Sequence, residues 1–299
     1  MRGDEATDLQ KPAGSSALSR PAAIRAWLAR VRFADWAHFL VLPLATIDAH
    51  ASRSDTLLAG ARGVGIAFTI LAFGFLINSV ADREMDIDVR KNSLVIPGAG
   101  AQGGSLIGLV AVCLLLSISS PWPAKLATAS CLVLGYIYSS GPRLKRVPVA
   151  GSLANVAGFT LLLFVGMQDA SLPPRFGWVA LVFAALLLQN QLIHEAADRL
   201  EDSAGGVRTS WLTLGPRWTV LIAAISGLGA AGATAFIVPR PRLSPVVLAA
   251  GAAFGVVFPL LLASRGMEPS RAARLRVTHR WCAASFGALC YLAWRSGTR

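Results

Sequence analysis

The sequence predicts an all-α integral membrane protein whose helices form a bundle around a central cavity. Of its 299 residues, 54% are hydrophobic and only 15% are charged, whereas soluble domains carry about 25% charged residues. The apolar residues gather in long windows, several of which approach or reach the roughly 20 residues that an α-helix needs to cross a bilayer. Lys and Arg concentrate in alternate connections between these windows, which is typical of a multi-pass protein.

Nine windows are predicted to be transmembrane helices. In chain order they cover residues 33–47, 57–80, 103–119, 124–138, 149–167, 178–193, 219–238, 245–263 and 281–294. The first is the weakest, because Asp35 and His38 interrupt a short apolar run. Residues 1–32 are predicted to be a disordered cytoplasmic tail, since their first twenty positions are polar, rich in Ala, Ser and Gly, and contain Pro12. The polytopic domain is then expected over residues 33–299.

The distribution of Lys and Arg predicts the orientation. With a cytoplasmic N-terminus, 20 of the 28 basic residues fall in cytoplasmic segments, in agreement with the positive-inside rule. Omitting the first window would move six N-terminal basic residues to the outer face, so the charge bias favours nine spans. We therefore expect a multi-pass protein of the inner or plasma membrane, with its N-terminus and charged loops cytoplasmic.

The net charge of +12 does not indicate nucleic-acid binding. In a membrane protein, basic loops contact anionic lipid and fix the topology, which accounts for the same charge. The four cysteines all lie in or at the edge of apolar windows without metal-ligand spacing. They are expected to act as small hydrophobic packing residues.

Two acidic runs follow the second and sixth windows on the same predicted side of the membrane. The first contains Asn78, Asp82 and Asp86, and the second contains His194, Asp198 and Asp202. In each run the side chains are spaced by four residues, which places them on one face if the segment is helical. We assign residues 78–86 to the loop after the second span and residues 198–202 to the loop after the sixth. Carboxylates at the edge of a bilayer are costly and need partners or a function, so the two runs predict a shared cation and phosphate site.

A short basic loop follows the fourth window on the same side. It contains Arg143, Lys145 and Arg146 between Pro142 and Pro148. The prolines limit helix continuation there. Two acidic loops and one basic loop are therefore predicted to converge on a phosphorylated ligand.

The residue types indicate a diphosphate held through Mg²⁺. Mg²⁺ prefers oxygen ligands and is usually bound by one or two carboxylates together with substrate phosphates. The expected metal ligands are Asn78, Asp82, Asp86, Asp198 and Asp202, and the cations that balance the remaining phosphate charge are Arg83, Arg143, Lys145, Arg146 and Arg208. Neutralising charge on a departing diphosphate favours heterolysis of an allylic C–O bond. Aromatic faces such as Tyr138 can stabilise the resulting carbocation.

Three motifs resemble those of the UbiA-type intramembrane prenyltransferases. They are the Asn78-x-x-x-Asp82-x-x-x-Asp86 run, the segment from Asp198 to Gly215 with its Gly-x-Arg-Thr and Leu-Gly elements, and the Tyr138–Arg146 loop. The resemblance implies a nine-helix membrane fold, Mg²⁺ dependence and a polyprenyl diphosphate donor whose prenyl group passes to a lipophilic or aromatic acceptor. It also implies catalytic roles for Asp82, Asp86, Asp198 and Asp202, and substrate binding by Asn78, Arg143, Lys145, Arg208, Tyr138 and His194.

Departures from the family pattern leave the acceptor open. Ser79 stands where the family often has Asp, and Lys91-Asn92-Ser93-Leu94 replaces the usual element after the first motif. A terpene cyclase of the same fold is therefore an alternative. A cation-coupled transporter is an alternative of another class, because intramembrane acids also mark ion pathways. His194 is interpreted either as a base or ligand or as a hydrogen-bonded packing residue.

Overall fold

The computed structural model describes residues 20–47, 52–84, 92–95, 102–172, 175–237, 243–264 and 268–297. The elements of the first half are α1 (Arg20–Arg30), α2 (Phe33–Trp36), η1 (Ala37–Thr46), α3 (Arg53–Ala81), η2 (Ser93–Val95), α4 (Gly103–Ser117), α5 (Trp122–Ser139) and η3 (Leu144–Arg146). Those of the second half are α6 (Ala150–Leu161), α7 (Phe176–Ala204), α8 (Ser210–Thr234), α9 (Leu243–Ala250), η5 (Gly251–Val257), α10 (Phe258–Ala263) and α11 (Pro269–Gly297). Every described regular element is helical, which agrees with the predicted fold class.

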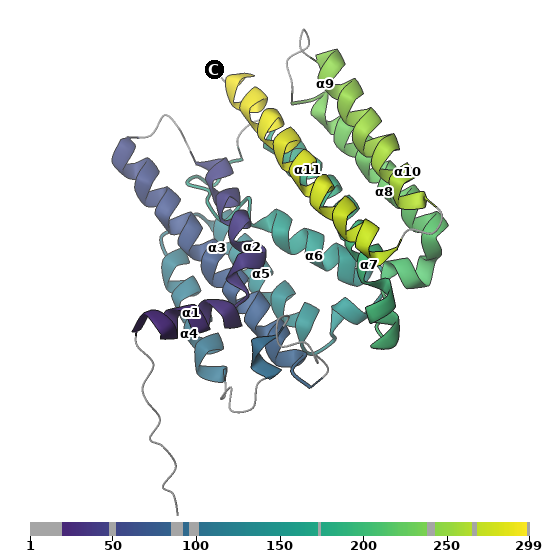
Figure 1. Cartoon of the computed structure of the whole chain (residues 1–299). Coiled ribbons are helices and arrows are strands. Elements are labelled where there is room, and N and C mark those ends of the chain that lie inside the picture. Colours follow the sequence, from purple (N-terminus) through teal and green to yellow (C-terminus); the bar gives the residue numbers. More distant parts are fainter. Residues whose placement is uncertain are drawn as a thin grey trace, which may run out of the picture.

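The helices form two groups, each with its own hydrophobic core. One core is built around α3, with α4 and α5 packed against it, and the other lies between α7, α8, α10 and α11. Helix α6 contacts both α5 and α7 and so lies between the groups (Figure 1). Leu42 of η1 and Phe164 after α6 pack against both cores.

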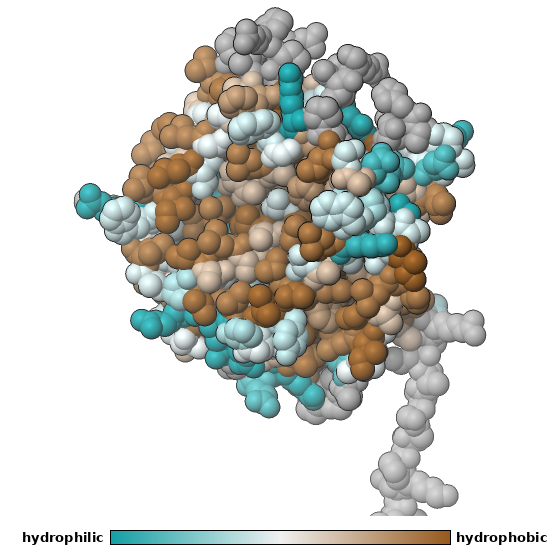
Figure 2. All heavy atoms as spheres, turned by 180° about the vertical axis from the view of Figure 1, so that it is seen from behind, coloured by the Kyte–Doolittle hydropathy of each residue, from teal (hydrophilic) through white to brown (hydrophobic). Residues whose placement is uncertain are grey.

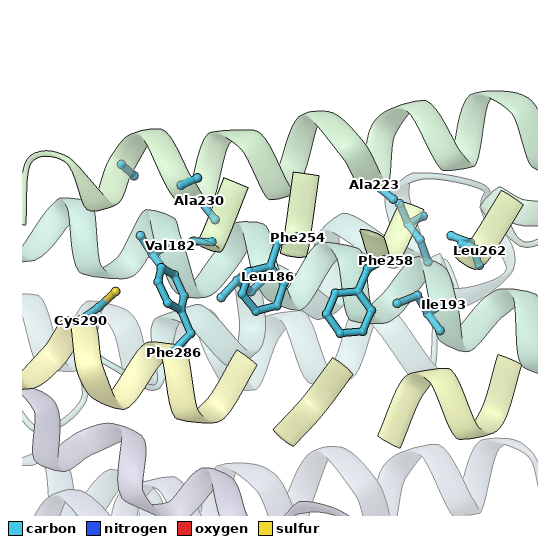
Figure 3. Packing of buried hydrophobic residues seen from close by; sticks show 14 of the residues in the cluster. Val182, Leu186, Ile193, Ala223, Ala230, Phe254, Phe258, Leu262, Phe286 and Cys290 are labelled. Carbon is cyan, nitrogen blue, oxygen red and sulfur yellow. The ribbon is translucent and has the colours of Figure 1, made fainter. Parts of the chain in front are cut away.

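The second core is built from stacked aromatic and aliphatic side chains. Phe254, Phe258 and Phe286 fill the space between α7, η5, α10 and α11 together with Leu186 and Ile193 (Figure 3). The rings of Phe254 and Phe258 are stacked with centroids 5.5 Å apart. Such pairs stabilise a packed interior beyond the area that they bury.

Among the described residues, four helices are long and apolar enough to cross a membrane: Arg53–Ala81, Phe176–Ala204, Ser210–Thr234 and the stretch Pro245–Ala263. Apolar side chains also dominate the face shown in Figure 2, where hydrophilic residues lie mostly toward the edges. Ile107, Leu248 and Trp281 are examples that are each more than 70% exposed. Soluble monomers rarely expose large apolar patches, so this surface fits a lipid environment.

Each of the nine predicted spans overlaps a helical segment, but three differ from the expected form. The first is α2 followed by the 3₁₀ helix η1, which contains Pro43. The fifth is an α-helix only to Leu161 and then tightens, because the amides of Leu162 and Leu163 bond three residues back. The eighth contains a π-helical stretch, η5. The count of nine transmembrane helices stays a prediction.

The N-terminal segment and the second acidic run also differ from expectation. Within the predicted disordered tail, residues 20–30 form α1, while residues 1–19 lie outside the described residues. The assignment of Asp198 and Asp202 to a loop is wrong, because α7 continues through them to Ala204. The same holds for Asn78, which lies in α3, whereas Asp82 directly follows that helix. Gly206, at φ 66°, ends α7, and the amide of Val207 bonds to the carbonyl of Asp202. This is a left-handed glycine cap.

Candidate active site

Lys145 connects the basic loop to the end of α3. Its ammonium lies 2.5 Å from each carboxylate oxygen of Asp82 and 2.9 Å from Oδ1 of Asn78. Ser139 Oγ donates to the same Asn78 oxygen at 3.3 Å. The Lys145 and Asp82 side chains are only 13% and 16% exposed, so this ion pair is largely shielded from water.

Burial changes the proton affinity of this lysine. Loss of hydration lowers the pKa of Lys145 below its ordinary value, because burial disfavours the charged form. The hydrogen bond that Lys145 donates to Asp82 and the negative charge of Asp82 raise this pKa, whereas Arg143 and Arg146 lower it further. The pKa of Lys145 is therefore set mainly by burial, which lowers it, and by Asp82, which raises it.

Two side chains from later in the chain donate hydrogen bonds to carbonyl groups at the C-terminus of α3. Arg143 donates to the carbonyl of Ala81 at 3.2 Å, and the amide of the buried Asn92 donates to the carbonyl of Ser79 at 2.8 Å. The last carbonyls of a helix have no intrahelical partner, so both contacts fix the turn that carries Asn78. Asn92 belongs to the element that departs from the family pattern.

The basic loop is held close to the start of α6 by a glycine. A Cβ on Gly151 would lie 2.7 Å from the carbonyl oxygen of Leu144, so only glycine permits this approach. Val149 has φ 64°, and its backbone amide donates a hydrogen bond to Ser210 Oγ at 3.0 Å. These contacts direct the short η3 segment, and Lys145 with it, toward the end of α3.

The second acidic run lies along the last turns of α7. His194 Nδ1 is 3.2 Å from Asp198 Oδ2, one turn further along the helix. Arg276 of α11 is within electrostatic range of Asp198. Tyr138 of α5 is within electrostatic range of Asp82, Asp202 and Glu195. Tyr138 is therefore near carboxylates of both acidic runs.

Glu195 is a buried polar residue that the sequence analysis did not select. It is 6% exposed, accepts a short hydrogen bond from Ser152 Oγ, and accepts the amide of Trp211 at 3.0 Å. Ser152 is also 2.8 Å from Ser210. This network joins α6, α7 and the first turn of α8. Its only sequence signal is an acid three residues before Asp198 in an otherwise apolar turn.

The remaining predicted site residues are placed as follows. Arg208 is exposed in the segment before α8, whose first turn is capped by Thr209 through its hydrogen bond from the Leu212 amide. Asp86 lies outside the described residues. Within the described ranges, no three His, Cys, Asp or Glu side chains gather in an arrangement that would hold a metal ion. Asn78, Asp82 and Lys145 are brought together, as are His194 and Asp198.

Comparison with known proteins identifies the family. The model of the UbiA prenyltransferase family matches residues 21–283. The chain belongs to the UbiA prenyltransferase family. Members of the UbiA family are membrane proteins, which agrees with the four long apolar helices found here.

Similar proteins of this family include one curated relative and several solved structures. The digeranylgeranylglyceryl phosphate synthase of Methanoculleus marisnigri is 32% identical over 179 residues, which cover 56% of this chain and 62% of that protein. A UbiA homolog from Archaeoglobus fulgidus bound to GPP and Mg²⁺ matches with a TM-score of 0.69, 20% identity, and coverage of 90% of this chain and 99% of that chain.

A solved structure described as a digeranylgeranylglyceryl phosphate synthase matches with a TM-score of 0.68 and 13% identity, over 91% of this chain and 99% of that chain. At these identities the solved structures establish a common fold.

Proposed function

We propose that this UbiA-family protein is a Mg²⁺-dependent intramembrane prenyltransferase that ionises a polyprenyl diphosphate and transfers the prenyl group to a lipophilic or aromatic acceptor. The observation that carries the proposal is the convergence of Asn78 in the last turn of α3, and of Asp82 directly after that helix, on Lys145 of the basic loop. This contact places a cation that can bind phosphate next to the first acidic run. Neither feature alone would indicate a diphosphate.

The residues at the end of α3 fit a metal ion. Three oxygens, one from Asn78 and two from Asp82, already face a single cationic atom within 2.9 Å. Carboxylate and amide oxygens are ligands that Mg²⁺ accepts. Asp198 and Asp202 supply carboxylates from α7, and Asp86 is a further proposed ligand. When bound with the diphosphate, Mg²⁺ supplies charge neutralisation on the leaving group.

The protein's own cations and aromatic groups provide the rest of the proposed mechanism. Lys145 is held at Asp82 and can also donate to a phosphate oxygen as a point charge, whereas Arg143 and Arg208 can bind oxygens in pairs. The ring of Tyr138, near the carboxylates of both runs, offers an aromatic face to an allylic cation. The apolar walls of the two helix groups exclude water that would otherwise capture the cation.

The acceptor is proposed to be lipophilic rather than water-soluble. The name of the Methanoculleus marisnigri relative, a digeranylgeranylglyceryl phosphate synthase, supports a lipid acceptor. The apolar outer surface supports delivery of both substrates from the bilayer (Figure 2).

Product analysis with purified protein tests the proposal. We expect mass spectrometry to detect a prenylated acceptor when prenyl diphosphates of ten to twenty carbons, Mg²⁺ and a lipid or aromatic acceptor are supplied. A cyclic hydrocarbon or alcohol formed without acceptor would instead support a terpene cyclase. Absence of diphosphate release from every donor, in protein that elutes as a folded species, would contradict both activities. Asp82→Asn should lose the product, whereas Asp55→Asn, at the opposite end of the same helix, should keep it.

A further inference from the structure

A pocket separate from the Asp82–Lys145 pair, here called the second pocket to distinguish it from the candidate active site, lies between η1, α7 and α11. Its volume is about 500 Å³, which is within the range of sites for small organic molecules. Most of its wall is apolar and includes Leu42, Val182, Leu186 and Ala283. Val182 and Leu186 lie along the side of α7 next to α11 (Figure 3). Such a wall suits a lipophilic ligand.

The polar part of this pocket contains His279, and the neighbouring Gln189 determines which ring nitrogen of His279 carries the hydrogen. His279 is fully buried, and its Nε2 lies 2.8 Å from Oε1 of Gln189. The amide nitrogen of Gln189 donates to two backbone carbonyls, those of Ala223 at 2.8 Å and Phe254 at 2.6 Å. Turning this amide around would set its oxygen against two carbonyl oxygens, so Oε1 must be the atom that faces His279. His279 is therefore the donor and carries its hydrogen on Nε2.

The other ring nitrogen of His279 is consequently a hydrogen-bond acceptor without a partner. Nδ1 is buried and has no hydrogen bond within the described part of the chain, and the same holds for Oδ1 of Asn190. Both residues line the pocket. Buried polar atoms are nearly always hydrogen-bonded in proteins. Two unsatisfied acceptors at one pocket point to a ligand that donates.

The charges around the pocket limit the kind of donor. Its lining includes Arg280 and contains no carboxylate within the described residues. Arg280 gives the lining a positive charge, while Asp35, which is within electrostatic range of Arg280, does not line the pocket. A neutral donor is therefore favoured over an ammonium group. An isoprenoid tail has no hydrogen-bond donor and would leave His279 Nδ1 without a partner.

The pocket and the second acidic run share the same two helices. Asn190, His194 and Asp198 follow one another at four-residue intervals on one face of α7, over about 12 Å. On α11, Arg276 precedes His279 by about one turn and is within electrostatic range of Asp198. A ligand in the pocket therefore approaches the carboxylates proposed to bind diphosphate.

We propose that this pocket binds the prenyl acceptor as a lipophilic molecule with a hydroxyl group, which donates a hydrogen bond to His279 Nδ1 and contacts Asn190. The assignment of this molecule as acceptor rests on the proposed prenyltransferase function. His279 and Asn190 would then select for the hydroxyl, and the apolar wall would hold the chain. Aliphatic and phenolic hydroxyls share this chemistry.

The test compares two probes that differ only in the hydroxyl. Binding of radiolabelled hexadecanol and of its methyl ether is measured with the protein in lipid nanodiscs, without Mg²⁺ or prenyl donor, and empty nanodiscs give the background. We expect hexadecanol to bind roughly three- to tenfold more tightly, the range for one neutral hydrogen bond. Equal binding of the two probes to the wild-type protein would overturn the inference.

Two variants test whether His279 and Asn190 cause the preference for hexadecanol. His279→Phe and Asn190→Leu should each reduce the preference for hexadecanol while binding of the methyl ether persists. Thr278→Val, at the exposed neighbouring position of α11, is the matched control and should retain it. If His279→Phe does not fold, Asn190→Leu decides. A preference that is unchanged in the folded variants would refute the roles of these residues.

A separate assay keeps this inference distinct from the proposed function. Release of diphosphate from a prenyl donor in the presence of Mg²⁺ does not require the hydroxyl preference. Diphosphate release without hydroxyl preference would contradict the acceptor site alone. Hydroxyl preference without diphosphate release would support a hydroxyl-binding pocket and contradict the prenyltransferase assignment.

Discussion

Lys145 donates hydrogen bonds to both carboxylate oxygens of Asp82, across a separation of 63 residues in the chain. Two residues earlier, Arg143 donates to the carbonyl of Ala81. In an α-helix, residues two apart point about 200° from each other. Here Arg143 has a left-handed conformation, with φ 51°, and the 3₁₀ segment η3 follows it. Both cations therefore reach the same end of α3.

The first prediction concerns Lys145. Lys145→Gln should lower kcat/KM for the prenyl donor by about 1.5–3 kcal/mol, roughly ten- to a hundredfold, because a charged hydrogen bond is lost. Steady-state kinetics of diphosphate release with the donor varied would measure this. Lys125→Gln, which removes an exposed lysine from the first turn of α5, is the control. Unchanged donor kinetics would restrict Lys145 to a structural or topological role.

The second prediction concerns the metal. Treatment with a chelator should abolish diphosphate release, and added Mg²⁺ should restore it. Asp198→Asn should stay inactive even at saturating Mg²⁺, because the substitution removes one charge from the cluster that holds the metal and diphosphate. Folding of the variant is checked by its elution as a single species in detergent. Turnover near the wild-type rate in Asp198→Asn would show that this carboxylate is not required.

The sequence was sufficient to predict the general fold, because an apolar window of about 20 residues is typical of a membrane-spanning helix. The second, sixth, seventh and eighth windows correspond to the four long apolar helices. It was also sufficient to select Asn78, Asp82 and Lys145, which the structure brings into contact. Spacing at i, i+4 depends only on helix geometry, and the basic loop has few conformations between two prolines.

The contacts that hold the site were not predictable, since they join residues far apart in the chain. Nothing in the sequence pairs Glu195 with Ser152, 43 residues away, or Gln189 with His279, 90 residues away. The extension of α7 through Asp198 and Asp202 differs from the expected loop, because a loss of hydropathy does not by itself end a helix. Hydropathy marks where the apolar surface ends, whereas the backbone continues until Gly206 ends the helix.

A third prediction addresses the buried carboxylate. Glu195→Leu should lower the free energy of unfolding by about 1–3 kcal/mol, because the buried donors of Ser152 and Trp211 lose their acceptor. Glu195→Gln should cost less, since the amide oxygen can still accept one of them. Denaturant titrations in mixed micelles would measure both variants. Equal stability of Glu195→Leu and the wild type would mean that these donors find other partners.

A fourth prediction tests the topology by cysteine labelling in a variant that lacks the four native cysteines. Cysteines at Ser203, which lies near the end of α7, and at Arg146 of η3 should react with a membrane-impermeant reagent added to the cytoplasmic side. A cysteine at Ser296 should react from outside, because α11 leads to a C-terminus at the opposite end from Pro269 (Figure 1). Labelling of Ser203 and Ser296 from one side would exclude an odd number of spans between them.

The fifth prediction concerns two glycines of α8 that differ only in what they face. A Cβ on Gly227 would lie 2.0 Å from the carbonyl oxygen of Phe254 in η5, whereas one on Gly229 would meet nothing within 4 Å. Gly227→Ala must therefore push α8 away from η5 and should destabilise the protein by about 1–3 kcal/mol, the usual cost of overpacking.

Gly229→Ala adds the same methyl group at an open position and should be neutral or stabilise the helix by up to about 1 kcal/mol. Comparing the two variants by denaturant titration separates the effect of the contact from the effect of helix propensity. Similar changes in the two variants would mean that α8 does not pack on η5 as closely as these contacts require. The same carbonyl of Phe254 accepts from Gln189, which orients His279. Gly227→Ala should therefore also weaken the preference of the second pocket for hexadecanol, while Gly229→Ala leaves it intact.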